Sequence, residues 1–180
     1  MANESKNSIH SKTVIEVITI ANDLCIFMEE FEKYDLEFAF LYMQKVLPLL
    51  YLKGAMLPEI ENTDEEANER FVTQEQWEAI FNSINKKTDT NDTFYFVEAK
   101  VMVASKGSIA ECLADIYQDL KDFLLLYQKN TLVAQENAVY YAKELFEKHW
   151  GSKLLNVHKA IHTLLYKSSD SSQFNGFSSN

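Results

Sequence analysis

Two pairs of side chains in the second half of the chain have types and spacings that could do chemistry. Asp115 and Asp119 are four residues apart in one segment of helical apolar periodicity. His158 and His162 have the same spacing in a later segment. Residues four apart lie on one side of a helix, so each pair could reach one cation, and two facing helices could supply four ligands. Such a site would suit a metal-assisted hydrolase acting on a phosphate ester or nucleotide.

The same region also fits a structural polar cluster. His149 continues the apolar line of its helix, and the indole N–H of the adjacent Trp150 needs an acceptor once it is buried. Asp119 and His162 each fall about 80° from the apolar seam of their helices, where a polar side chain is partly buried and needs a hydrogen-bond partner. We therefore predict one cluster between three helices, serving packing before chemistry, that contains Asp119, His149, Trp150 and His162.

Asp115 and His158 complete the set of candidate polar residues in this region. The acidic side chains on this flank of the helix are otherwise expected in solvent. Asp115 lies about 120° from the apolar seam of its helix, and Glu111 and Asp122 lie further round it. We expect no resident metal and no cofactor, because the chain has neither HExxH nor a Glu-x-x-His pair repeated on two helices. If a metal is bound, the sequence indicates Asp115, Asp119, His158 and His162 as its ligands.

Other reaction classes lack their sequence signatures. The chain has no glycine-rich phosphate loop and no GxSxG motif. We therefore favour a non-catalytic binding or adaptor domain, whose partner is a protein or a small ligand, over the metal-assisted hydrolase.

Charge excludes two kinds of partner. The formal net charge is −10, and the segment 59–70 (EIENTDEEANER) holds six of the acids and one arginine. A negative surface without a basic stripe repels phosphate backbones, which argues against nucleic acid and anionic membranes. Residues 1–12 lack the apolar core of a secretory signal, and no segment reaches the roughly 20 apolar residues that span a bilayer. We expect a cytoplasmic protein, with Cys25 and Cys112 as reduced core thiols.

The elements that must position these residues are predicted to be helices. Only four glycines and two prolines serve 180 residues, which favours a few long helices over many short strands. Apolar spacings of three and four residues predict an all-α, single-domain bundle of about six helices over 13–167, with one short extended segment or strand pair near 94–103. Residues 1–12 are predicted to be flexible and residues 168–180 disordered.

Local signals predict where these helices begin and bend. Thr13, Asp35, Thr73 and Ser108 are the expected N-caps, three of them with Glu or Gln three residues later. Pro48 is expected to kink or restart its helix near Val46, because it lacks an N–H. Gly151 is expected in the left-handed conformation, closing one helix at a tight corner before the last helix.

Three blocks of sequence carry a family resemblance. LPLLYLK (47–53), DIYQDLK (115–121) and FEKHWG (146–151), followed by His162, resemble blocks of a bacterial family known as domain of unknown function 5063. The similarity spans most of 13–165. It implies a small helical bacterial protein without an assigned activity, and it assigns no catalytic residue. Members often carry histidine soon after the HWG block, where this chain has Ser152 and Lys153. A histidine-rich site would therefore contain fewer histidines in this chain.

Overall fold

The computed structural model describes residues 8–60, 69–98 and 102–174, with the side chains of Glu98 and 167–174 left out. The fold is an all-α bundle with one short strand pair, as predicted. None of the described helices is long and apolar enough to cross a membrane.

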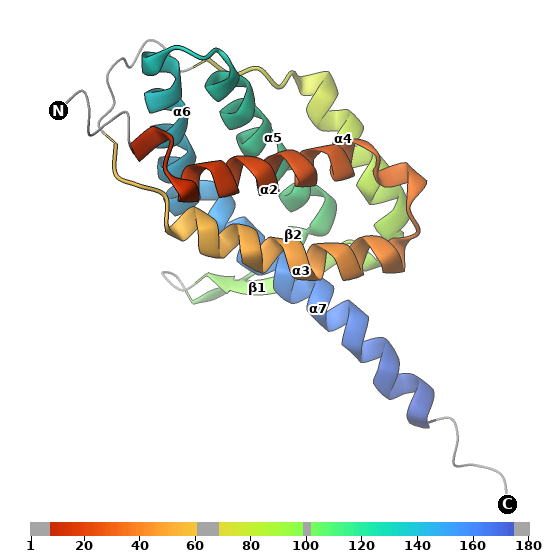
Figure 1. The fold of residues 1–180 in the computed structure, drawn as a ribbon. Coiled ribbons are helices and arrows are strands. Elements are labelled where there is room, and N and C mark those ends of the chain that lie inside the picture. Colours follow the sequence, from red (N-terminus) through yellow and green to blue (C-terminus); the bar gives the residue numbers. More distant parts are fainter. Residues whose placement is uncertain (1–7, 61–68, 99–101, 175–180) are drawn as a thin grey trace, which may run out of the picture.

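The first two long helices form an antiparallel hairpin. α2 (Lys12–Glu29) begins after Ser11, whose side chain accepts the N–H of Val14, so the predicted cap at Thr13 was wrong by two residues. α3 (Leu36–Ala55) begins at the predicted cap, where Asp35 accepts the N–H of Phe38 at 2.8 Å. The two helices lie side by side at the front of Figure 1. Within the segment 1–12, Ile9 is fully buried and its carbonyl accepts the Tyr127 hydroxyl.

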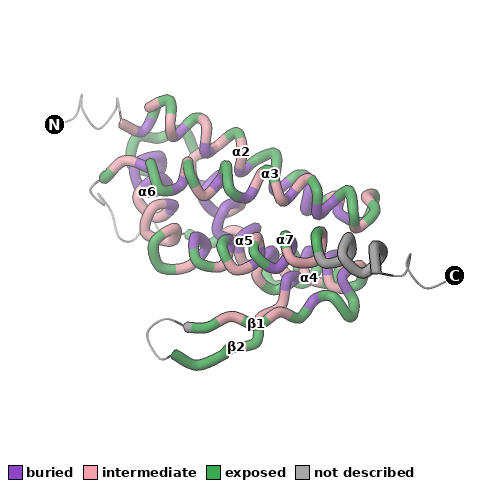
Figure 2. Tube along the Cα trace, turned by 90° about the horizontal axis from the view of Figure 1, so that it is seen from below, coloured by how far each residue is buried: buried purple, intermediate pink, exposed green. Residues whose placement is uncertain are grey.

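The middle of the chain forms one helix and the strand pair. α4 (Gln74–Thr88) opens with the predicted capping box between Thr73 and Gln76. Strands β1 (Thr93–Glu98) and β2 (Val103–Ser108) pair antiparallel, with Phe94 opposite Gly107. A Cβ at position 107 would overlap the Phe94 ring, so glycine is needed there. Figure 2 shows this hairpin projecting from the helices.

The central helix is α5 (Ile109–Gln128), which packs against α2, α4, α6 (Leu132–Leu145) and α7 (Gly151–Phe174). Twelve of its 20 residues are buried, whereas a helix with one covered face buries far fewer. Ser108 caps α5 as predicted, accepting the N–H of Glu111 at 3.0 Å. Most side chains that α5 directs away from its apolar seam therefore still meet a neighbour.

α6 and α7 are joined by a π-helical turn (Phe146–Trp150), not by the expected tight corner. Gly151 has helical dihedral angles (φ −64°, ψ −44°), so the left-handed assignment was wrong. Glycine is needed for another reason: a Cβ at this position would overlap the carbonyl oxygen of Phe146. The chain is thus helical without interruption from α6 into α7, and the wider turn changes which way His149 and Trp150 point.

Two further expectations concern Pro48 and the end of the chain. α3 continues through Pro48, so the restart expected near Val46 as an alternative to a kink is not seen. α7 extends to Phe174 and overlaps the segment from residue 168 whose disorder stays a prediction. The first glycine or proline after Lys167 is Gly176, so no helix-breaking residue stands before that point. Residues 175–180 lie outside the described residues, as do 1–7 and most of the acidic segment 59–70.

Candidate functional site

Three aspartates of α5 form a row that joins the helices around it. Asp115, Asp119 and Asp122 follow one another at spacings of four and three residues and share one side of α5. Asp119 and Asp122 are buried and Asp115 is half-buried. Together they accept hydrogen bonds from the segment before α4, from α4, from the π turn and from α7. We call these residues the carboxylate row.

Asp119 is the most enclosed member of the row, with 1% of its side chain exposed. Its Oδ2 lies 2.5 Å from Nδ1 of His149, and its Oδ1 accepts Nη1 of Arg70 at 3.0 Å. A carboxylate only accepts hydrogen bonds, so His149 donates from Nδ1 and its Nε2 is left for solvent or a ligand. The π turn is what directs His149 at α5.

Asp122 anchors the segment that leads into α4. Its Oδ1 accepts the backbone N–H groups of Phe71 and Val72, both at 2.8 Å, and its Oδ2 accepts Nη1 of Arg70 at 3.0 Å. Partial burial opposes ionisation of Arg70, but hydrogen bonds to Asp122 and Asp119 raise its pKa above the ordinary value. The prediction that Asp122 faces solvent was wrong.

Asp115 joins α4 and α7 to α5. Its Oδ1 accepts the indole N–H of Trp77 at 2.9 Å, and its Oδ2 accepts the ammonium group of Lys153. Burial opposes the charge of Lys153, but the hydrogen bond to Asp115 raises the pKa of this lysine. Lys153 occupies one of the two positions after the HWG block at which the family resemblance suggests a histidine.

The two histidines of α7 lie away from the carboxylate row. Pro48 lacks an N–H, so the carbonyl of Gln44, one turn earlier in α3, loses its helical partner. His158 Nε2 lies 3.2 Å from that carbonyl oxygen and donates to it. His162 is exposed, and its ring lies 4.6 Å from the ring of Tyr166. The structure therefore brings Asp119 and His149 together but not Asp119 and His162.

Trp150 is buried among apolar groups and is not part of the carboxylate row. Its indole N–H donates to the carbonyl of Ala142 at 3.1 Å, and its ring meets Phe146 edge-on at 4.8 Å. A Cβ at Gly54 would overlap the indole ring, so α3 approaches the π turn closely only because that position is glycine. Trp150 thus fastens α3 to the joint between α6 and α7.

These placements limit the chemistry of the carboxylate row. Within residues 8–60, 69–98 and 102–174, no three His, Cys, Asp or Glu side chains gather as they would around a metal ion. The hollow beside Arg70, Asp119 and Asp122 has a cavity volume of about 20 Å³, space for about one water molecule. His149 could accept a proton at Nε2, but this hollow holds no substrate-sized molecule. The arrangement therefore suits packing.

Two partners of the row and one of its members were not predicted from the sequence. Arg70 is the one basic residue of an acidic segment, Trp77 carries no signal of a polar partner, and Asp122 lies far from the apolar seam of α5. The spacing of Asp115, Asp119 and Asp122 was a usable signal. Three acids on one side of a helix that is otherwise rich in leucine indicate a polar seam facing a second set of elements.

The histidine placements predict distinct effects on stability. His149→Ala should lower the free energy of unfolding by about 1 to 3 kcal/mol, because Asp119 then keeps a buried, partly unpaired carboxylate. His162→Ala should change it by less than about 0.5 kcal/mol, since the side chain is exposed. Urea denaturation followed by circular dichroism measures both. Equal losses in the two variants would contradict the assignment of His149 to the row.

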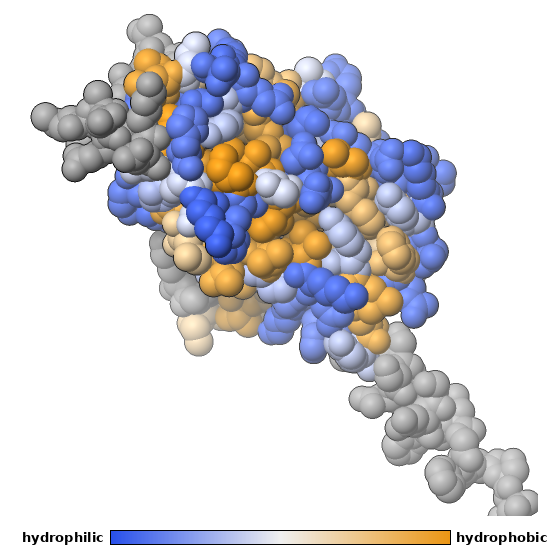
Figure 3. Space-filling model, in the orientation of Figure 1, coloured by the Kyte–Doolittle hydropathy of each residue, from blue (hydrophilic) through white to orange (hydrophobic). Residues whose placement is uncertain are grey.

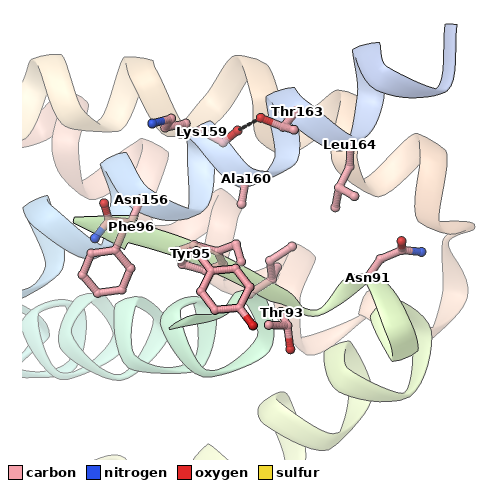
Figure 4. A pocket seen from close by; sticks show the side chains of 11 residues that line it. Asn91, Thr93, Tyr95, Phe96, Asn156, Lys159, Ala160, Thr163 and Leu164 are labelled. Atoms are coloured by element: carbon pink, nitrogen blue, oxygen red, sulfur yellow. Dashed lines mark hydrogen bonds between the residues drawn. The ribbon is translucent and has the colours of Figure 1, made fainter. Parts of the chain in front are cut away.

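A larger groove lies between the β1–β2 hairpin and α7. One cavity of about 330 Å³ is shown in Figure 4, where Asn156, Ala160 and Leu164 point from α7 toward the aromatic side chains of β1. A second, of about 500 Å³, lies between β2 and the starts of α5 and α7. Phe96 and Asn156 line both cavities, which together we call the hairpin groove. Volumes of this size accommodate ligands.

The hairpin groove is apolar at its base and basic at its sides. Phe94, Phe96 and Ile109 contribute aromatic and aliphatic surface, and Lys106, Lys153 and Lys159 outnumber the single acid, Glu111. No ion pair joins Lys106 or Lys159 to another described residue. Cys112 also lines the groove, and burial raises the pKa of its thiol to about 11, so it is protonated at neutral pH. Both cysteines are free thiols.

Comparisons with known proteins agree with the fold. Protein BF1032 from Bacteroides fragilis, known from a crystal structure, is 34% identical, with a TM-score of 0.79 over 88% of this chain and 96% of that one. No curated protein matches the chain. The model of the family described as domain of unknown function (DUF5063) matches residues 8–167. The chain belongs to this family.

Proposed function

We propose that the protein is a non-catalytic binding domain, and that the hairpin groove binds an extended, acidic peptide segment of another protein. The observation that carries this proposal is the groove itself. It combines two neighbouring cavities that share Phe96 and Asn156, an aromatic base, and the lysines Lys106 and Lys159, which have no ion partner among the described residues, on a chain whose net charge is −10. A basic groove on an acidic protein favours an acidic ligand.

The strand pair supports an extended ligand. β1 pairs with β2 on one edge and with no strand on the other in the described part of the chain. A free edge offers N–H and C=O groups to an added strand, and alternate side chains of that strand enter pockets on the covered face. Tyr95 and Val97 on β1 are 72% and 62% exposed, which leaves apolar surface for such a strand to cover. A two-stranded sheet is marginal alone, so a third strand would stabilise it.

The metal-assisted hydrolase receives no comparable support. Asp115 is engaged by Trp77 and Lys153, and Asp119 is engaged by Arg70 and His149. His158 and His162 lie on α7 with other partners. A shared cation would require all of these contacts to be exchanged for new ones.

Fluorescence anisotropy with two labelled heptapeptides tests the proposal. Both peptides alternate valine and leucine with charged residues, glutamate in one and lysine in the other. We expect saturable binding of the glutamate peptide and at least about tenfold weaker binding of the lysine peptide, a difference of 1.4 kcal/mol. The double variant Lys106→Glu, Lys159→Glu should reverse the preference.

Two further variants separate the groove from the rest of the surface. Ala160→Trp fills the cavity of Figure 4 and should abolish binding of the glutamate peptide, with an unchanged circular dichroism spectrum. Lys86→Glu changes an exposed lysine outside the groove and should bind like the wild type. Absence of binding to either peptide, or undiminished binding by Ala160→Trp, would overturn the proposal.

A further inference from the structure

The outer face of the α2–α3 hairpin carries apolar side chains where a surface helix normally carries charges. Six of the eight exposed residues of α3 are apolar, and the exposed Met56 follows its last residue; the six are Phe38, Leu41, Pro48, Leu49, Leu52 and Ala55. On α2, Ile15 and Ile26 are 46% and 47% exposed. Figure 3 shows the hydrophobic surface gathered on this side of the molecule. We call this surface the front face.

The exposed residues of α3 form one stripe. At about 100° per residue they fall within an arc of about 120°, the width by which an amphipathic helix usually contacts a core. The opposite side of α3 is already packed, with Phe40, Met43 and Leu47 buried. A helix that is apolar on every side is normally covered on every side. Contiguous exposed apolar surface of this kind marks an interaction site.

Only one charged side chain stands in the middle of the stripe. Lys45 is exposed and forms no ion pair with any residue that the structure describes. Asp23 lies on the side of α2 next to α3 and is also exposed. It too forms no ion pair with any residue that the structure describes. The front face therefore carries an unpaired positive charge within the apolar stripe of α3 and an unpaired negative charge on α2, whose exposed residues other than Ile15 and Ile26 are polar.

The register of the α2–α3 hairpin places these two charges at one level. Phe27 stacks on Tyr42 at 4.1 Å, and Glu16 pairs with Lys53 at 2.6 Å, as antiparallel neighbours do. Because the two helices are antiparallel, moving three residues forward in α3 from Tyr42 corresponds to moving three residues back in α2 from Phe27. Lys45 therefore lies level with Leu24, which is next to Asp23. A two-fold axis parallel to the hairpin would set each α3 over the α2 of a second copy at this level.

We infer that the front face joins two copies of this chain, with Lys45 of each copy opposite Asp23 of the other. The α2–α3 hairpins of the two copies then stack face to face as two layers of two helices. Leu52 lies over the region of Ile15 and Thr19 of the second copy, so apolar residues meet on both sides of the ion pair. A two-fold axis across the helices would instead bring the two Lys45 side chains together, which their charge opposes.

The size of the front face suits a stable dimer. A 20-residue helix is about 30 Å long, and two helices side by side are about 20 Å wide, which gives a flat footprint of about 600 Å². Side-chain relief adds to this, and a standard interface buries about 800 Å² on each partner. The inference does not depend on the hairpin groove, which lies between other elements.

Light scattering after size exclusion tests the dimer on the full chain, over protein concentrations of about 1 to 200 μM, a range that brackets typical homodimer affinities. We expect a dimer for the wild type. Leu52→Asp should raise the dissociation constant at least tenfold. Leu155→Asp, which changes a leucine of similar exposure on α7, should remain dimeric. Far-ultraviolet circular dichroism checks that every variant is folded.

A charge exchange tests the register. Asp23→Lys and Lys45→Asp should each weaken the dimer about tenfold, and the double variant should restore it to within about threefold of wild type. A wild type that stays monomeric throughout, or a dimer that Leu52→Asp leaves intact, would overturn the inference. Failure of the double variant to restore the dimer would overturn the pairing of Lys45 with Asp23.

Discussion

Trp150→Ala is expected to lower the free energy of unfolding by about 4 kcal/mol, within the range of large-to-small core substitutions. The side chain is 1% exposed and lies where α3 meets the joint between α6 and α7. Its removal leaves a cavity that the neighbouring helices cannot fill without moving, and it removes the hydrogen bond to Ala142. Chemical denaturation followed by far-ultraviolet circular dichroism measures the loss.

The other tryptophan of the chain provides the matched control. Trp77 is half-buried on α4, and its N–H donates to Asp115. Trp77→Ala should cost about 2 kcal/mol, because less apolar area returns to water. Trp150→Phe should recover about half of the loss seen with alanine, since the ring is kept and the N–H is not. If Trp150→Ala lowered the free energy of unfolding by less than Trp77→Ala does, the role assigned to Trp150 would be contradicted.

Asp122→Ala is expected to lower the free energy of unfolding by about 3 kcal/mol. The backbone N–H groups of Phe71 and Val72 lose their shared acceptor, and each unsatisfied buried donor costs about 1 to 3 kcal/mol. Arg70 is half-exposed and keeps Asp119, so it adds little. Equilibrium urea unfolding measures the change.

Two variants separate the acceptor role of Asp122 from its charge. Asp122→Asn keeps an oxygen for the two N–H groups and should lose only about 1 to 2 kcal/mol. Glu111→Ala, an exposed acid of the same helix, should change stability by less than about 0.5 kcal/mol. Equal losses for Asp122→Ala and Glu111→Ala would show that the backbone contacts contribute nothing.

Sequence patterns predicted the parts of this fold that depend on neighbours along the chain. The all-α class, the strand pair, the caps at Asp35 and Ser108 and the capping box at Thr73 follow from residues within one or two turns of each other. Ser11 was missed because Thr13 satisfies the same local rule. Serine and threonine two residues apart are nearly equivalent as caps.

What could not be predicted depends on contacts between distant segments. Asp122 was placed in solvent because the apolar seam of α5 lies elsewhere, yet residues 70–72 cover it, and their irregular backbone has no sequence period. The partner of His158 could not be predicted, because it exists only where Pro48 frees a carbonyl in α3. His162 was expected beside Asp119 but is exposed. Its position at the edge of the apolar stripe of α7 does not say whether another helix packs against that edge.

The π turn between α6 and α7 has a consequence for insertions and deletions. One residue corresponds to about 100° of rotation in an α-helix, and the π turn holds about one residue more per turn than an α-helix does. Removing one residue between Phe146 and Trp150 would therefore restore a regular helix and leave the rotation of α7 about its own axis nearly unchanged. A deletion in the regular part of α6 would not be absorbed in this way and would turn all of α7 by about 100°. His158 would then leave the carbonyl of Gln44, and Leu154, Val157 and Ile161 would leave the core.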